Sequence, residues 1–197
     1  MHTTPALPSR RSMLTLLTHT ALVLPLQAIG AQTGSTAARR PGPLAEADIV
    51  AAQRDWETGL LDIARTHADH GPAAARARAA RMIDRLYGYA WGPVLFKPTL
   101  AGGTQTFRTT RAGALAYFAG GDPDFPDDTG FALKPWREVR IRNVGMQIRH
   151  DTAMVMSRAV LTDDRGRVTE VDKSWGYRRG PEGLRIVLHH SSLARVE

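Results

Sequence analysis

Three short turn sequences divide the second half of the chain into four extended segments, and this pattern restricts the possible folds more than any other feature. The turns lie at His150-Asp151, at residues 163–166 and at residues 180–183. Their aspartate, glycine and proline residues are typical of connections between neighbouring strands. The extended segments cover about residues 137–149, 152–162, 167–179 and 184–193. This spacing predicts an antiparallel sheet in which each strand pairs with the next.

The first predicted strand changes the phase of its apolar alternation near Asn143. Val139 and Ile141 share one face, whereas Val144, Met146 and Ile148 share the other. Side chains alternate between the two faces of a strand, so one extra residue at this point returns the two sets to the same side. The sequence therefore predicts a β-bulge near Asn143 that bends the sheet.

Helical periodicity precedes the strands. Apolar spacing predicts one helix over about residues 45–67 and a second over about 73–87, with Gly71-Pro72 between them. A third, short helix is predicted to begin after a cap at Thr109 or Thr110 and to end near Phe118. Residues 89–99 are predicted to be extended because of their prolines. Helices followed by a bent antiparallel sheet indicate an α+β fold with the helices packed on one face of the sheet.

Composition narrows the possible functions. The 197 residues include no cysteine, which excludes disulfides and cysteine-ligated metals. The formal net charge is +7, and Arg78, Arg81 and Arg85 recur at helical spacing beside an apolar stripe. We interpret these arginines as the solvated face of a helix, so nucleic acid is not an expected partner.

The first residues of the chain have the order of a secretory signal. Arg10-Arg11 precede an uncharged run over residues 13–29, and small residues follow this run. We therefore interpret residues 1–31 as a signal peptide, and its paired arginines resemble those of a twin-arginine signal. Residues 32–43 would form a flexible lead-in, and residues 44–197 a single domain. The protein is expected to be periplasmic or secreted, without a stable membrane anchor after signal cleavage.

The last predicted strand runs directly into the polar residues His189-His190-Ser191-Ser192. Alternation predicts one face made of three aliphatic side chains, a histidine and a hydroxyl: Leu184, Ile186, Leu188, His190 and Ser192. His189 and Ser191 would lie on the opposite face. An apolar wall that leads to a few polar groups is typical of a ligand pocket. A strand end that is hydrated by solvent would show the same pattern.

Several segments, in this order, resemble the iota-class carbonic anhydrases. They are Leu95-Phe96-Lys97-Pro98-Thr99, Phe107-Arg108-Thr109-Thr110, Ala114-Leu115-Ala116-Tyr117-Phe118, Gly130-Phe131-Ala132-Leu133-Lys134-Pro135-Trp136 and Leu188-His189-His190-Ser191-Ser192-Leu193. The resemblance covers roughly residues 82–193, and five ordered blocks are more specific than any one of them. It implies the cone-shaped α+β fold of nuclear transport factor 2-like and SnoaL-like proteins. Ala194 departs from the family, because relatives often carry proline after the last block.

The resemblance also implies an activity and a site. The activity is the reversible hydration of CO2 to bicarbonate and a proton. The site residues that carry over, as catalytic and bicarbonate-binding groups, are Thr99, Tyr117, His190 and Ser192. Members of the family are described both as metal-free and as metal-dependent, so zinc or manganese is the alternative to a site without a cofactor. By analogy with other proteins of this fold, a homodimer is also expected.

The residues themselves favour a site without a metal. His189 and His190 are neighbours on a predicted strand, so their rings point to opposite faces and are poorly placed to chelate one ion. Hydroxyl groups from Thr99, Tyr117 and Ser192 would instead hold the oxygens of bicarbonate. We assign His190 the role of orienting water or relaying its proton. The group that finally deprotonates the water is not apparent from the sequence.

Two other functions are consistent with the same pattern. The chain could be a SnoaL-like isomerase or hydratase for a larger apolar ligand, although the expected pocket positions lack an evident aspartate. It could also be a non-catalytic ligand-binding module, which would have a pocket but no turnover. Measurement of CO2 hydration distinguishes both from a carbonic anhydrase.

Overall fold

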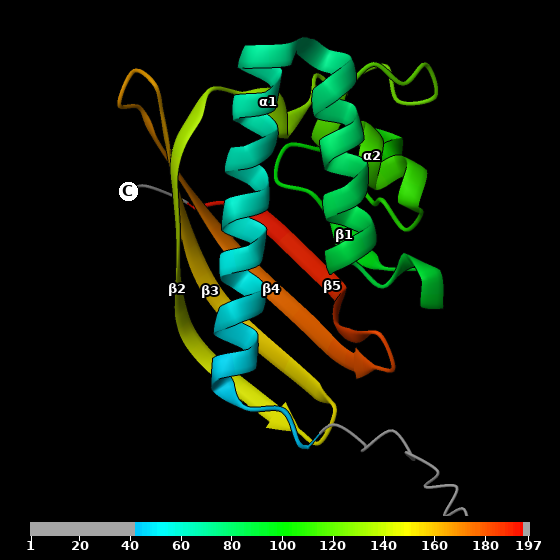
Figure 1. Ribbon diagram of the computed structural model, residues 1–197, viewed down its shortest axis with the longest axis vertical. Coiled ribbons are helices and arrows are strands. Elements are labelled where there is room, and N and C mark those ends of the chain that lie inside the picture. The colour runs from blue at the N-terminus through cyan, green and yellow to red at the C-terminus, as the bar shows by residue number, and fades with distance from the viewer. Residues whose placement is uncertain (1–41, 195–197) are drawn as a thin grey trace, which may run out of the picture. The chain divides into compact units, whose positions relative to one another are not determined.

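A twisted sheet covered on one face by helices forms the part of the chain that the computed structural model describes, residues 42–194 (Figure 1). Its main elements are α1 (Glu46–Leu86), β1 (Leu95–Lys97), α2 (Arg111–Ala119), β2 (Trp136–Arg149), β3 (Thr152–Asp163), β4 (Val168–Gly180) and β5 (Gly183–Leu193). The predicted α+β class and the packing of helices on one face of the sheet are confirmed. The predicted signal peptide and nearly all of the predicted lead-in lie outside the described residues.

The sheet has the strand order β1-β5-β4-β3-β2. The four long strands pair antiparallel in succession, as the turn pattern predicts. A fifth strand, β1, pairs parallel with β5 and was not predicted. The prediction of an extended segment over residues 89–99 is wrong at its start, because residues 89–91 form a 3₁₀ turn before β1.

Two irregularities alter the strand register. The predicted bulge is present in β2, where the pairing with β3 shifts between Asn143 and Gly145. A second shift, which was not predicted, separates two pairs of β4 and β5: Tyr177 pairs with Ile186, and Gly176 pairs with Leu188. One residue of β5 is therefore extra at this point, and every side chain beyond it faces the other way from simple alternation.

Helix α1 consists of two segments that lie side by side (Figure 1). Gly71 separates them with a φ of 79° and a ψ of −178°, a conformation that glycine adopts readily, and Pro72 follows it. The two predicted helices and the break between them are therefore confirmed. The segments approach closely at Gly59, where an added Cβ would come within 2.7 Å of the Met82 sulfur.

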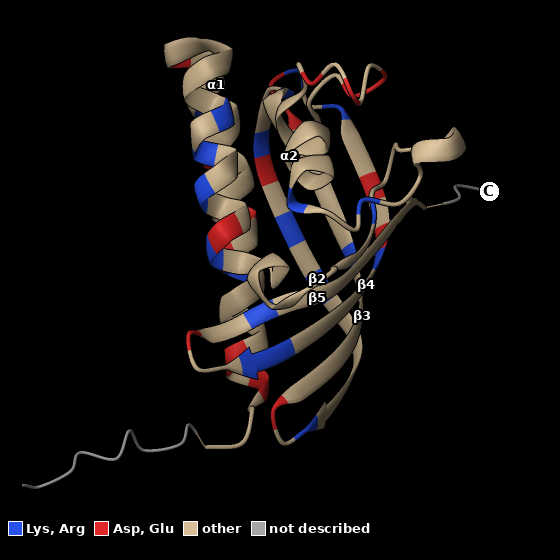
Figure 2. Ribbon diagram, turned by 90° about the vertical axis from the view of Figure 1, so that its right-hand side faces the viewer, with Lys and Arg blue, Asp and Glu red and all other residues tan. Residues whose placement is uncertain are grey.

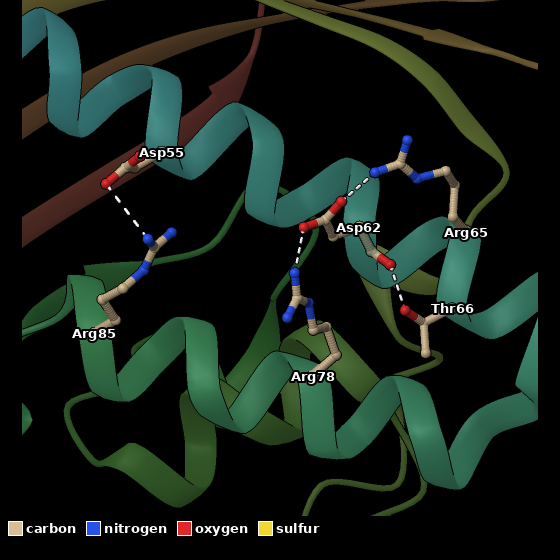
Figure 3. A network of polar contacts seen from close by, with 6 residues as sticks. All are labelled: Asp55, Asp62, Arg65, Thr66, Arg78 and Arg85. Atoms are coloured by element: carbon tan, nitrogen blue, oxygen red, sulfur yellow. Dashed lines mark hydrogen bonds and ion pairs between the residues drawn. The ribbon is translucent and has the colours of Figure 1, made fainter.

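Exposed ion pairs also join the two segments of α1 (Figure 3). Asp62 accepts hydrogen bonds from Arg65 on its own segment and from Arg78 on the other. Arg85 lies 3.7 Å from Asp55. Each exposed pair of this kind contributes at most about 1 kcal/mol. Arg78 and Arg85 are exposed, which confirms that these arginines belong to a solvated helix face.

Helix α2 begins and ends at residues that suit these positions. The Thr110 hydroxyl accepts a hydrogen bond from the Gly113 amide at 3.1 Å, so the predicted threonine cap is confirmed. Gly120 ends the helix with a φ of 62°. The Arg76 guanidinium donates to the Gly120 carbonyl at 2.7 Å and so ties α2 to the second segment of α1.

The helices bury their apolar residues against the sheet. Trp56, Leu60 and Ile63 of α1 are at most 1% exposed, and they belong to the same core as Trp175 and Tyr177 of β4. Acidic and basic residues are interspersed over helices and strands (Figure 2). None of the helices within residues 42–194 has both the length and the apolar character that a membrane span requires.

Candidate active site

The most unusual polar group in the core is the imidazole of His189 on β5. His189 is 1% exposed, and its ring lies between two aromatic rings. The Trp175 ring stacks on it with centroids 4.1 Å apart, and the Phe96 ring stacks at 4.9 Å. Phe96 belongs to β1, so the unpredicted parallel strand supplies one wall of this cage.

Both nitrogen atoms of the His189 ring have partners. Nδ1 lies 2.9 Å from the Tyr87 hydroxyl, which also accepts a hydrogen bond from the Trp56 indole at 3.0 Å. Nε2 lies 2.9 Å from the Lys173 ammonium nitrogen. Burial and the Lys173 charge hold the pKa of His189 well below its usual value. The ring is therefore neutral at physiological pH.

Lys173 and Ser191 complete this polar cluster. The Lys173 nitrogen lies 2.8 Å from the Ser191 hydroxyl oxygen, which is itself 3.1 Å from His189 Nε2. Burial lowers the pKa of Lys173 to about 7. The same nitrogen lies 4.5 Å from the centre of the Trp56 ring, a favourable position for an ammonium ion. We call His189, Lys173, Ser191 and Tyr87 the buried polar cluster.

Tyr117 of α2 lies on the same side of the sheet. Its ring and the Phe96 ring are nearly perpendicular, with centroids 5.7 Å apart, so Phe96 contacts both Tyr117 and His189. The Tyr117 hydroxyl is buried and has no hydrogen-bond partner within the described residues. Burial raises the pKa of Tyr117, and the nearby Leu100 backbone and Thr99 act in the opposite direction without meeting its hydroxyl in hydrogen-bond geometry. The structure thus brings Thr99 and Tyr117 together, as the resemblance implies.

The other two expected site residues lie elsewhere. His190 is exposed and Ser192 is half-buried, and both border a groove on the opposite face of the sheet together with Val144 and Met156. The expectation that they share a face with Ile186 is wrong. The unpredicted shift between Ile186 and Leu188 reverses the alternation, so His189 and Ser191 face the helices instead.

Sequence reasoning therefore assigned none of the four members of the buried polar cluster to the site, and it placed His189 and Ser191 on the wrong face of β5. Ser191 could have been found only from the register shift. Lys173 pairs with Ser191 across the two strands and sits on a strand whose alternation is apparent in the sequence. Tyr87 directly follows α1, and nothing in its surroundings along the chain indicates a contact with residue 189.

The arrangement offers hydrogen bonds and a proton-accepting amine rather than metal ligands. Within residues 42–194, no group of three or more histidine, cysteine, aspartate or glutamate side chains is arranged to hold a metal ion. The buried polar cluster contains one imidazole, and its other polar atoms are an amine and two hydroxyls. Such groups can hold an oxyanion and exchange protons with it.

Comparison with known proteins identifies relatives over the same region. Residues 47–193 match the family model described as metal-independent carbonic anhydrase. A metal-independent carbonic anhydrase of Nostoc sp. is 50% identical over 151 residues, which are 76% of this chain and 74% of that protein.

One solved structure shows the same similarity. The iota-carbonic anhydrase from a cyanobacterium, complexed with bicarbonate, is 49% identical, with a TM-score of 0.77 over 79% of this chain and 95% of that one. This agreement confirms the fold that the resemblance implies. An NTF2-like protein with a cystatin-like fold from Novosphingobium aromaticivorans is 13% identical and overlaps with a TM-score of 0.45 over 76% of this chain and 86% of that one.

Proposed function

This chain belongs to the family of metal-independent carbonic anhydrases, and on that premise we propose that it hydrates CO2 reversibly at a site between Tyr117 and the buried polar cluster. The proposed location of the site rests on the Tyr117 hydroxyl, which is buried and has no hydrogen-bond partner in the described residues. A buried hydroxyl that stays unpaired costs about 1–3 kcal/mol, so a bound oxyanion would supply a missing partner.

We assign bicarbonate binding to Thr99, Tyr117 and Ser191, with His189 as the orienting imidazole. Thr99 and Tyr117 keep the roles that the resemblance implies. His189 and Ser191 replace His190 and Ser192 in this proposal, because they face the same side of the sheet as Tyr117. Hydroxyl donors placed around the oxygens would stabilise the charge that develops as CO2 gains an oxygen from water.

The family supports a reaction without a cofactor, since its description is that of metal-independent enzymes. It also favours the carbonic anhydrase over the two alternatives, a SnoaL-like isomerase and a binding module. The test is a stopped-flow assay of CO2 hydration with protein that has been chelated for a long period. Activity should persist with substoichiometric zinc, manganese and calcium. A folded sample without activity above background would contradict the proposal, and activity that returns only with one metal would reject the metal-free reaction.

A homodimer formed through the outer face of the sheet is the second part of the proposal. Three large apolar side chains on β2 and β3 are strongly exposed there: Val144 at 75%, Met154 at 64% and Met156 at 65%. They line a continuous apolar groove with Leu188. Exposed apolar patches of this kind are typical of interfaces, and a symmetric pair of chains would cover the same patch on both.

The third part concerns location. Arg10-Arg11 and the uncharged run after them support export to the periplasm or beyond the cell. The proposed reaction is compatible with that location, because it needs neither a reduced thiol nor a soluble cofactor. Sequencing of the N-terminus in protein from the native host tests the proposal.

A further inference from the structure

Lys173 is a buried lysine whose hydrogen-bond partners, His189 and Ser191, carry no negative charge. Its residue is 5% exposed, and no carboxylate among residues 42–194 contributes to its environment as a charged partner. An ammonium ion in such a place has lost its hydration, and in return it gains hydrogen bonds to His189 and Ser191 and the nearby Trp56 ring, but no opposite charge. A methionine or leucine would fill the same volume at a lower cost in folding free energy. Stability therefore does not explain a lysine at this position, and a function would.

The hydrogen bonds around Lys173 are compatible with two proton arrangements. With a charged Lys173, the ammonium donates to His189 Nε2, and His189 Nδ1–H donates to the Tyr87 hydroxyl oxygen. With a neutral Lys173, the Tyr87 hydroxyl donates to Nδ1, and Nε2–H donates towards Ser191. The arrangements differ by one proton on Lys173 and by the tautomer of His189.

We propose that Lys173 is the proton acceptor of CO2 hydration and that it acts through the Ser191 hydroxyl while setting the tautomer of His189. This inference rests on the proposed function and supplies the base that the sequence leaves unidentified. Lys173 is a positioning residue in this scheme, because Ser191 and His189 lie between it and the substrate.

The proposed step balances in atoms and electrons. The oxygen of water forms a bond to the carbon of CO2, and one C=O electron pair moves to an oxygen atom of the product. The O–H bond of the water breaks, its proton passes to Ser191 Oγ, and the Ser191 hydroxyl proton passes to the Lys173 amine over the 2.8 Å contact. The products are bicarbonate and a Lys173 ammonium ion, which later gives its proton to buffer.

The groups packed around Lys173 are consistent with this role. From β5 come His189 and, next to it on the outer face, His190. From β1, the Lys97 ammonium donates to the Ser191 carbonyl at 2.9 Å, which places a second cation near the cluster.

The other elements bring mostly uncharged groups. Tyr87 follows α1, and β3 supplies Ser157, the residue paired with Lys173. On α1 the carboxylate of Glu57 accepts a hydrogen bond from the Ile141 amide of β2 at 2.6 Å and is thereby committed elsewhere. Burial lowers the pKa of Lys173 to about 7, so the amine can take up and release a proton at the near-neutral pH at which bicarbonate is the product of hydration.

Nitrogen-15 NMR of the unaltered protein, titrated from about pH 5 to 9, tests the proton coupling without reference to activity. We expect the Lys173 signal to change from ammonium to amine near neutral pH. The His189 ring should change in the same step from the Nδ1–H to the Nε2–H tautomer. A Lys173 signal that stays that of an ammonium ion over the whole range would overturn the proposal.

Kinetics of Lys173→Met, with Lys134→Met as a matched substitution of an exposed lysine, provides the second test. In the unaltered protein, kcat for hydration should rise as the pH increases through about 7. In Lys173→Met, kcat should no longer depend on pH in this way and should be about 100-fold lower, with KM nearly unchanged. Lys134→Met should behave like the unaltered protein. A folded Lys173→Met variant with a normal kcat and pH profile would reject the inference. If the unaltered protein hydrates no CO2, the proposed function fails instead, and the NMR titration still decides whether Lys173 and His189 are coupled.

Discussion

The imidazole of His189 lies flat against the indole of Trp175, with ring centroids 4.1 Å apart and an interplanar angle of 14°. This stack fixes the plane of the imidazole, and the partners of its two nitrogen atoms fix its rotation within that plane. The ring is thus held before any substrate binds, which is what a group that orients a reactant requires.

The two adjacent histidines should differ sharply in their effect on catalysis. We expect His189→Gln to lower kcat for CO2 hydration by about 100-fold, because its hydrogen bonds to the cluster are lost. His190→Gln, on the exposed face, should change kcat by less than about twofold. Stopped-flow assays of both variants, with circular dichroism to verify folding, provide the measurement. The opposite order would restore the assignment of His190 that simple strand alternation predicts.

Removal of the Tyr117 hydroxyl should separate activity from stability. Tyr117→Phe is expected to lower kcat by about 100-fold, because it removes a donor to bicarbonate. The free energy of unfolding should not fall and should rise by up to about 1 kcal/mol, since a buried unpaired hydroxyl is lost. Urea unfolding measures this change.

Tyr89→Phe is the matched control for that experiment. The Tyr89 hydroxyl donates to the Arg108 carbonyl at 2.8 Å, so its removal should lower the free energy of unfolding by about 1 kcal/mol with little effect on kcat. A destabilised Tyr117→Phe variant would contradict the location proposed for bicarbonate.

Stability should increase with pH above neutrality because of Lys173. Burial lowers its pKa in the folded protein to about 7, whereas the unfolded chain has the ordinary value of 10.5. Between these values the unfolded state binds more protons than the folded state, so the free energy of unfolding rises with pH, by up to about 1.4 kcal/mol per unit. Urea unfolding at pH 7, 8 and 9 should show this rise in the unaltered protein and lose it in Lys173→Met. Equal slopes in the two proteins would mean that Lys173 does not titrate in this range.

A charge on the outer sheet face should break the proposed dimer. Met156→Glu places a carboxylate in the apolar groove, and we expect sedimentation equilibrium to change from dimer to monomer. Val168→Glu is the control, because Val168 is 59% exposed but does not line the groove. A monomeric unaltered protein, or a Met156→Glu variant that remains dimeric, would reject this interface.

The mature N-terminus should lie near Ala31 or Gln32 in protein from the native host. The small residues after the uncharged run suit cleavage at this point. N-terminal sequencing of the extracytoplasmic fraction measures it. Protein that begins at Met1 and remains in the cytoplasm would show that residues 1–31 are not a cleaved signal.

The sequence by itself determined the features that depend on neighbouring residues. Turn residues and alternation located all four long strands, the phase change near Asn143 located a bulge, and Gly71 marked the break in α1. The Thr99–Tyr117 pair came from the family resemblance and is present in the structure.

Only the tertiary structure decided which face of β5 carries the chemistry. The register shift between Ile186 and Leu188 arises from the pairing of β5 with β4, and a strand's own residues do not specify how its partner is aligned. The strand β1 also depends on its partner. Its three residues form a strand only by pairing with β5, where Leu95 is aligned with Leu188, more than 80 positions later in the chain. Alternation along β4 already places Lys173 on the same face as Val171 and Trp175, but its contact with His189 depends on the pairing of β4 with β5 and on the packing of α1 over the sheet.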